Sequence, residues 1–266
     1  MSQEVAAEEL DLGRVGRCIY CDATDDLRDE HPIPFGLGGR AKLYDSTCGR
    51  CADITSAFEG HVLRSQLGAF RTVLRLPTRR PRSRPASFRA RLRRGGSWAY
   101  EDVPLERYTA AGAFPRLPVP GVAEGRPEGG PIRMTGAVGV TVIRTEGERN
   151  PAARAGADAI EMNVPIALVA FMRLLAKVAL GYSVAFFGAD RLDPAIRGVV
   201  LGTDADINRW VGCPPPEWAV FGSPAAAHNV RVANIYGFVV AWVRMFATAG
   251  APEYMVIVGR LRPAAD

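Results

Sequence analysis

The longest apolar stretch of the sequence, residues 164–187, predicts a helix that is buried in a protein core. Arg173 and Lys177 stand near its centre, and each charge costs about 2.5–3.5 kcal/mol at the middle of a bilayer. We therefore exclude a membrane span and expect no membrane partner. Asn163 is a suitable cap and Pro165 suits a first turn, while Arg173 and Lys177 share one helix face. The side chains expected to point inward are Ile166, Val169, Leu174 and Val178.

Strand patterns occupy much of the remaining sequence. Residues 87–93 alternate between apolar and basic positions, which is the period of a half-buried strand with arginines on its open face. Residues 132–144 also have strand character, and residues 230–247 and 254–261 are rich in β-branched and aromatic side chains. A further helix is expected at residues 52–74. The chain is therefore expected to have an α+β fold.

Changes in composition divide the chain into four expected segments. Residues 1–15 are a polar tail, and residues 16–76 hold the paired cysteines and the first helix. Residues 77–130 combine a basic arm, a strand and a linker rich in Gly and Pro; the arm cannot continue a helix, because its prolines fix φ and remove backbone donors. Residues 131–266 form an α+β domain of unknown role, for which a homodimer surface is one candidate use.

The charged residues are unevenly distributed. The chain has a formal net charge of +5, and residues 60–100, here called the arginine belt, contain no acidic residue. Each phosphate that an arginine neutralises releases condensed counterions, so the belt is expected to bind nucleic acid with little dependence on sequence. The alternative is a solvated surface that pairs with acids elsewhere, such as Glu101, Asp102 and Glu106. The arginines expected to bind nucleic acid are Arg79, Arg80, Arg82, Arg84, Arg89, Arg91 and Arg93.

Four of the 5 cysteines form two Cys-x-x-Cys pairs, Cys18 with Cys21 and Cys48 with Cys51. Four thiolates in two close pairs can close a tetrahedral zinc site. The acidic start of the chain does not resemble a secretory signal, so we expect a reduced, cytoplasmic protein with a structural zinc ion. A thiol redox pair is the competing interpretation. Cys213 lies apart among prolines and is expected to be incidental.

The insertion between the two cysteine pairs carries the candidate chemistry. Glu30 precedes His31, one of 3 histidines in the chain, and the sequence continues as PIPFGLGG over residues 32–39. A histidine can serve as a general base near neutral pH, since its unperturbed pKa is about 6.5. Taken alone, however, a histidine beside acids is more often part of a surface ion pair.

Together, the cysteine pairs, Glu30-His31, the Leu-Gly-Gly of residues 37–39 and the later Glu59 resemble the zinc-knuckle HNH endonucleases, which have the ββα-metal fold. The resemblance covers about residues 16–62. It implies that His31 activates water for attack on a DNA phosphodiester, and that Glu30 binds one catalytic divalent ion, magnesium or another divalent cation. It also implies that the four cysteines hold a structural zinc that fixes two strands against a helix.

The sequence matches this family incompletely at two positions. Asp45 stands near the place where the family commonly has Asn, and would orient His31 or bind the divalent ion. The family usually has His or Asn directly after the last cysteine, but this sequence has Ala52, which cannot bind a metal. The candidate substitutes for that ligand are Glu59, which we favour, then Asp53 and His61.

We therefore expect an HNH-type endonuclease that hydrolyses DNA phosphodiesters with a histidine general base and a divalent ion. The alternative is a non-catalytic, zinc-dependent nucleic-acid-binding protein on a degenerate HNH scaffold, in which Ala52 marks the loss of activity. The expected catalytic residues are His31, Glu30, Asp45 and Glu59, and the expected ligands of the divalent ion are Glu30, Asp53 and Glu59.

Overall fold

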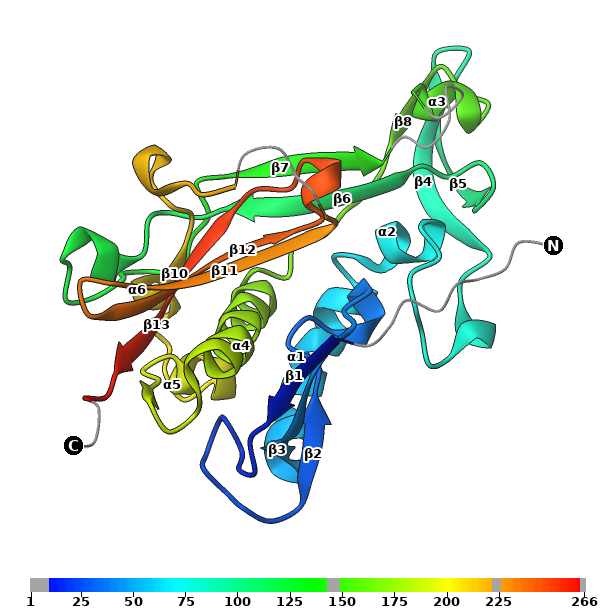
Figure 1. Ribbon diagram of the computed structural model, residues 1–266. Coiled ribbons are helices and arrows are strands. Elements are labelled where there is room, and N and C mark those ends of the chain that lie inside the picture. The colour runs from blue at the N-terminus through cyan, green and yellow to red at the C-terminus, as the bar shows by residue number, and fades with distance from the viewer. Residues whose placement is uncertain (1–9, 143–148, 222–225, 264–266) are drawn as a thin grey trace.

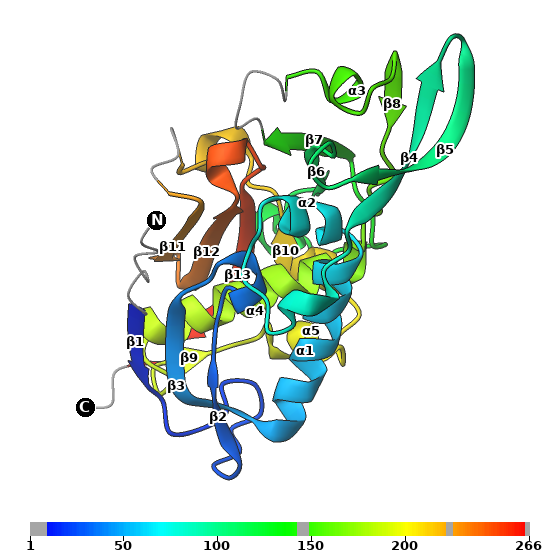
Figure 2. The same cartoon turned by 90° about the vertical axis from the view of Figure 1, so that its right-hand side faces the viewer.

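The computed structural model describes residues 10–142, 149–221 and 226–263. Its helices and strands form an α+β structure (Figure 1 and Figure 2). One continuous cluster of buried side chains extends from the paired cysteines to the strands near the carboxyl terminus. The amino-terminal segment and the carboxyl-terminal half therefore share a hydrophobic core. The segment boundaries drawn from composition stay predictions.

The amino-terminal part is a small sheet followed by a helix. β2 (Leu27–Glu30) and β3 (Ala41–Cys48) are antiparallel, and β1 (Leu10–Arg14) pairs with β3 in parallel. α1 (Gly49–Arg64) follows β3 directly. The expected polar tail of residues 1–15 therefore overlaps a strand at its end. The side chains of β1 are largely exposed, so the strand depends on backbone pairing and leaves no apolar pattern in the sequence.

After a break, α1 is followed by a second short helix, α2 (Gly68–Val73). The prediction of one helix over residues 52–74 is wrong at this break. The break buries Gln66, whose side-chain amide donates to the carbonyl of Ala113 (2.9 Å) and accepts from the amide of Ala167 (3.2 Å). A buried amide needs such partners, and both belong to segments distant in the sequence.

α4 (Leu168–Phe187) is the central helix of the molecule. It packs between α1 and the carboxyl-terminal sheet (Figure 1). α4 is long and apolar enough to cross a membrane by length and composition alone, but most of it is buried within the fold. The expected buried helix is present, although it begins after Pro165 and leaves Val169 45% exposed instead of buried.

The face of α4 toward α1 carries the two charged residues that the sequence placed together. The guanidinium of Arg173 lies 4.6 Å from the centre of the Phe58 ring, and Lys177 reaches the same side. One turn further along, a Cβ at Gly181 would lie 2.8 Å from the side chain of Pro32. The backbone of α4 thus contacts the loop that follows His31, and glycine permits this close approach.

The carboxyl-terminal sheet covers the other side of α4. Its strands are antiparallel in the order β10-β13-β12-β11, and β9 pairs with the end of β13. Most side chains of β12 and β13 are buried, in agreement with their β-branched and aromatic sequences. The bounds are β9 (Leu192–Asp193), β10 (Val211–Gly212), β11 (His228–Ile235), β12 (Phe238–Met245) and β13 (Tyr254–Leu261).

A hairpin extends away from the body of the molecule (Figure 2). β4 (Ser87–Arg94) and β5 (Ser97–Pro104) form it, and β8 (Ala159–Glu161) pairs with the outer part of β4. The alternation of residues 87–93 thus predicted a strand correctly. A second antiparallel pair joins β6 (Ala110–Arg116) to β7 (Gly136–Val142). The remaining helices are α3 (Pro151–Arg154), α5 (Arg197–Leu201) and α6 (Ile207–Trp210).

Candidate functional site

The four paired cysteines meet at one end of α1. Cys18 and Cys21 lie in the turn before β2, Cys48 ends β3, and Cys51 is in the first turn of α1. Their sulfur atoms all lie within 4.8 Å of one another, and the Sγ atoms of Cys21 and Cys48 are 3.6 Å apart. Thiolates bound to one tetrahedral zinc ion at about 2.3 Å lie about 3.8 Å from each other. The cluster is therefore placed to hold a zinc ion.

The first cysteine pair is held by a turn and by a cation from α5. The amide of Cys18 donates to the carbonyl of Ala23 (2.7 Å), and Asp22 inside the turn has a φ of 61°. Arg197 donates to the carbonyl of Ile19 (2.8 Å) and to the carboxylate of Asp22 (2.6 Å). The hydrogen bond from Arg197 to Asp22, together with the positive charge of Arg197, lowers the pKa of Asp22. The carboxyl-terminal half thus supports the cysteine turn directly.

A buried ion cluster lies further along α1, where a lysine joins two carboxylates. The Nζ atom of Lys177 on α4 is 2.7 Å from Oε1 of Glu30 and 2.6 Å from Oε1 of Glu59. The same ammonium donates to the carbonyl of His31 (2.7 Å) and lies 3.5 Å from that of Pro32. The side chain of Lys177 is 1% exposed. Four elements, β2, the loop after it, α1 and α4, therefore meet at one nitrogen atom.

The second carboxylate oxygen of Glu30 is also hydrogen-bonded. The hydroxyls of Tyr20 and Thr47 each donate to Oε2 of Glu30 at 3.2 Å. Tyr20 is fully buried, and burial together with the charges of Glu30 and Glu59 raises its pKa well above the usual value. Glu30 is thus a fixed, buried acceptor with partners on both oxygens.

The protonation of the cluster follows from burial and from charge pairing. Burial by itself lowers the pKa of Lys177, but the carboxylates of Glu30 and Glu59 outweigh it, and the pKa rises above its usual value. Burial raises the pKa of Glu59, Lys177 lowers it, and Glu30 raises it again, so that it ends above the usual value. Lys177 is therefore charged at neutral pH.

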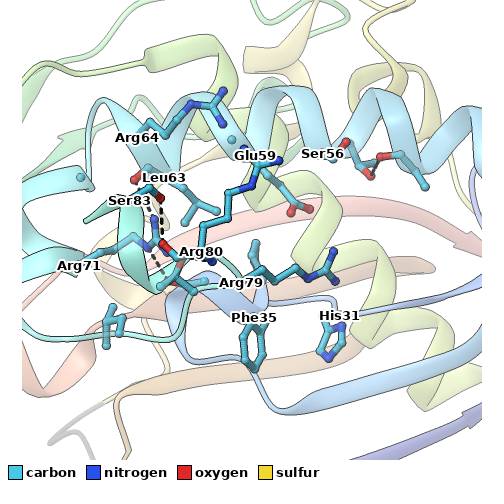
Figure 3. Close-up of a pocket in the computed structure, with 18 of the residues that line it drawn as sticks. His31, Phe35, Ser56, Glu59, Leu63, Arg64, Arg71, Arg79, Arg80 and Ser83 are labelled. Atoms are coloured by element: carbon cyan, nitrogen blue, oxygen red, sulfur yellow. Dashed lines mark hydrogen bonds between the residues drawn. The ribbon is translucent and has the colours of Figure 1, made fainter. Parts of the chain in front are cut away.

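A cavity of about 1050 Å³ opens beside this cluster (Figure 3). One wall is α1 with Asp53, Ser56 and Glu59, and the facing wall holds His31 and Phe35. The rings of His31 and Phe35 meet edge to face, with their centroids 6.2 Å apart. The segment after α2 closes the cavity from the side, and its exposed residues Arg79 and Arg80 line the space. Arg79 extends between Glu59 and His31.

Not all of the predicted site residues reach this cavity. His31, Glu30, Glu59 and Asp53 line it, as does Ala52. Asp45 lies elsewhere: its carboxylate pairs with Arg14 of β1, and its amide donates to Asp29 at 3.3 Å. Asp45 therefore does not meet His31 in the described structure. His61 is an exposed residue near the end of α1, and it does not line the cavity.

The predicted arginines separate into two groups. Arg79, Arg80 and Arg84 line the cavity, and Arg84 also donates to the carbonyl of Leu76. Arg82 is exposed within the short 3₁₀ turn at Pro81–Ser83, so the basic arm contains one short helical turn. The second group, Arg89, Arg91 and Arg93, lies on the hairpin.

One face of the hairpin combines these arginines with aromatic rings. Arg89 lies 5.5 Å from the centre of the Tyr100 ring, and Arg91 and Arg93 lie 5.0 and 5.7 Å from that of Trp98. Tyr100 is 65% exposed and Trp98 is 36% exposed. Arg91 also pairs with Glu161 of β8 at 3.1 Å. The hairpin arginines therefore have features of both interpretations of the arginine belt. They form an open basic face, and one of them pairs with an acidic residue.

Sequence reasoning missed Lys177, Tyr20 and Thr47 as members of the site. From the sequence, Lys177 is a charge that excludes a membrane span and that shares a helix face with Arg173. A lysine in the middle of an apolar helix carried a stronger signal, because a buried ammonium requires acidic partners. Glu30 and Glu59 were already singled out as acids, but the sequence held no indication that one lysine joins them.

Comparisons with models of protein families, with curated proteins and with solved structures found no match to this chain.

Replacing Cys21 with Ser is expected to remove about one zinc ion per chain and to lower the midpoint of thermal unfolding, because a three-thiolate site binds zinc less tightly. Cys21 is the exposed member of the cluster, so the substitution disturbs packing least. Zinc content by elemental analysis measures the effect, and Cys213→Ser, outside the cluster, is the matched control. Equal zinc contents in the two variants would contradict this assignment.

Replacing Lys177 with Met is expected to lower the free energy of unfolding by about 3–5 kcal/mol, because two buried carboxylates lose their cation. The raised pKa of Lys177 means that its contribution is complete below the unfolded value of about 10.4 and is lost as pH rises through the folded value. Urea unfolding of wild type and variant between about pH 7 and 11 measures both effects.

The control for that measurement is the triple variant Glu30→Gln, Glu59→Gln, Lys177→Met. It removes every charge of the cluster, so it is expected to regain most of the lost stability. A triple variant as unstable as Lys177→Met alone would show that the loss comes from packing and not from unpaired carboxylates.

Proposed function

We propose that this protein hydrolyses phosphodiester bonds in nucleic acid, as an HNH-type endonuclease with His31 as its general base. One observation carries the proposal: His31 and the exposed guanidinium groups of Arg79 and Arg80 line the same cavity. Guanidinium groups recognise phosphate oxygens, and an imidazole can remove a proton from water near neutral pH. The cavity therefore combines a base with a phosphate-binding wall.

The proposed reaction uses these groups in fixed roles. His31 takes a proton from a water molecule, and the water oxygen forms a bond to phosphorus. The bond from phosphorus to the leaving sugar oxygen breaks, and that oxygen takes up a proton from solvent. Arg79 and Arg80 offset the negative charge that develops on the phosphoryl oxygens.

The local architecture around His31 supports the same assignment. β2, β3 and α1 follow one another as strand, strand and helix, and the four cysteines join the strands to the start of the helix. This is the order that the ββα-metal resemblance implies. A zinc ion bound there would fix the relative positions of His31 and α1, and would take no part in the reaction.

Two of the three carboxylates expected to bind a catalytic divalent ion are already paired with a cation. The ligands expected for magnesium were Glu30, Glu59 and Asp53, but the first two share the ammonium of Lys177. Asp53 lines the cavity and remains a carboxylate that a divalent ion could use.

We propose nucleic acid as the substrate, with DNA as the expected form, because basic groups extend beyond the cavity. Arg82 is exposed in the same segment as Arg79 and Arg80 but outside the cavity lining, and the hairpin adds arginines together with exposed Trp98 and Tyr100. Arginine and aromatic side chains together bind phosphates and stack on bases. A homodimer stays a prediction.

A second candidate is a non-catalytic nucleic-acid-binding protein on the same scaffold. Two observations favour it: Ala52 lines the cavity where the family has a metal ligand, and Lys177 lies between the two acids. This candidate keeps the zinc site, the cavity and the arginines, and has no cleavage step.

Replacing His31 with Ala is expected to lower the rate of DNA cleavage by at least about 100-fold, because a general base typically contributes that much. Conversion of supercoiled plasmid to open-circular and linear forms, with and without added magnesium, measures the rate. His61→Ala is the matched control, since His61 is exposed on α1 and lies outside the cavity. Equal cleavage by both variants, or none by the wild type under any metal, would exclude the enzymatic function.

Replacing Arg79 and Arg80 together with Ala is expected to weaken DNA binding, because the cavity wall loses two cations. The slope of log K against log salt is expected to fall by about 1 for each phosphate that is no longer neutralised. Fluorescence anisotropy with a labelled duplex at several salt concentrations measures the slope. Arg231→Ala, on the exposed face of β11, is the control. An unchanged slope in the double variant would place the nucleic acid elsewhere.

A further inference from the structure

We infer that Lys177 is the resident cation of the centre formed by Glu30 and Glu59, so that an ammonium takes the place of a divalent ion between these two carboxylates. The reaction that this centre would serve rests on the proposed function. The identity of the cation does not, because it follows from contacts within the chain.

The ammonium of Lys177 has a full set of hydrogen-bond acceptors. Its nitrogen lies 2.6–2.7 Å from three oxygens, one from each of Glu59, Glu30 and the carbonyl of His31. An ammonium group has three protons to donate, so these oxygens satisfy it completely. Bonds of this length to carboxylates are at the short end for charged pairs. The position between the two acids is therefore filled.

Lys177 is also held in this position by the packing around it. Its side chain is 1% exposed, and α4 is packed between α1 and the carboxyl-terminal sheet. The close approach of Gly181 to Pro32, one turn further along α4, fixes the helix against the same loop. A divalent ion that bridges Glu30 and Glu59 would have to displace a buried, paired ammonium and leave it without partners, which is costly.

The ammonium of Lys177 affects both the charge of the cavity and the position of the His31 backbone. Two carboxylates beside a phosphate-binding wall would repel an anionic substrate, and Lys177 neutralises part of that charge. Its hydrogen bond to the carbonyl of His31 also holds the backbone of the proposed base. Lys177 is therefore a positioning residue: it acts through Glu30, Glu59 and His31 and, being buried, does not touch the substrate.

The experiment measures cation binding and not cleavage, so that its failure is separate from failure of the proposed function. Mn²⁺ is titrated into the zinc-loaded wild type, Glu30→Gln, Lys177→Ala and the double variant Glu30→Gln, Lys177→Ala, and free Mn²⁺ is followed by electron paramagnetic resonance. Wild type and Glu30→Gln are expected to bind Mn²⁺ equally. Lys177→Ala is expected to gain a site between Glu30 and Glu59 that binds Mn²⁺ about tenfold more tightly than the double variant does. This tenfold difference in affinity corresponds to about 1.4 kcal/mol.

A purely structural lysine would give no such gain, because its loss would destabilise the fold without creating a cation site. The inference is overturned if the wild type, with Lys177 in place, binds one more Mn²⁺ than Glu30→Gln does. It is also overturned if folded Lys177→Ala and the double variant bind Mn²⁺ equally. If Lys177→Ala does not fold, the comparison of wild type with Glu30→Gln decides alone.

Discussion

The contact on which the structure depends is the buried pairing of Lys177 with Glu30 and Glu59. A charge in the interior is tolerated only beside its partners, so this pairing requires β2, α1 and α4 to meet at one point. α4 in turn carries the carboxyl-terminal sheet on its opposite side. The cysteine-bearing segment and the rest of the chain are therefore joined by a polar constraint as well as by a shared apolar core.

The cysteine cluster and the ion cluster fix the same helix at two levels. A zinc ion bound by the cysteines would hold the first turn of α1 through Cys51, and Glu59 holds the helix two turns later. Asp53 and Ser56 line the cavity between these two points, and Gly60, Leu63 and Arg64 line it beyond Glu59. The α1 wall is thus held by the ion pair at Glu59, and the facing wall is held through the carbonyl of His31 by the same ammonium. Rigid placement of this kind is what a catalytic or binding site needs.

The sequence predicted what depends on local pattern or on near neighbours in the chain. The cysteine pairs, the alternation of residues 87–93 and the apolar run of α4 each carry their signal within one segment, and each was found. The break after α1 depends on Gln66 and its distant partners, and β1 depends on pairing alone. The ion cluster joins residues more than one hundred positions apart, so no window of the sequence could reveal it.

Ala52 and the buried Lys177 have one physical explanation in the proposed centre. On the proposed HNH scaffold, Ala52 would leave out one ligand of the divalent ion, and a divalent ion with few oxygen ligands is poorly held. An ammonium requires only three acceptors, and Glu30, Glu59 and the carbonyl of His31 supply them. Alanine at position 52 therefore costs this centre nothing as long as Lys177 is present. The central helix of the carboxyl-terminal half thereby becomes part of the site, because it supplies the charge that the cysteine-bearing segment lacks.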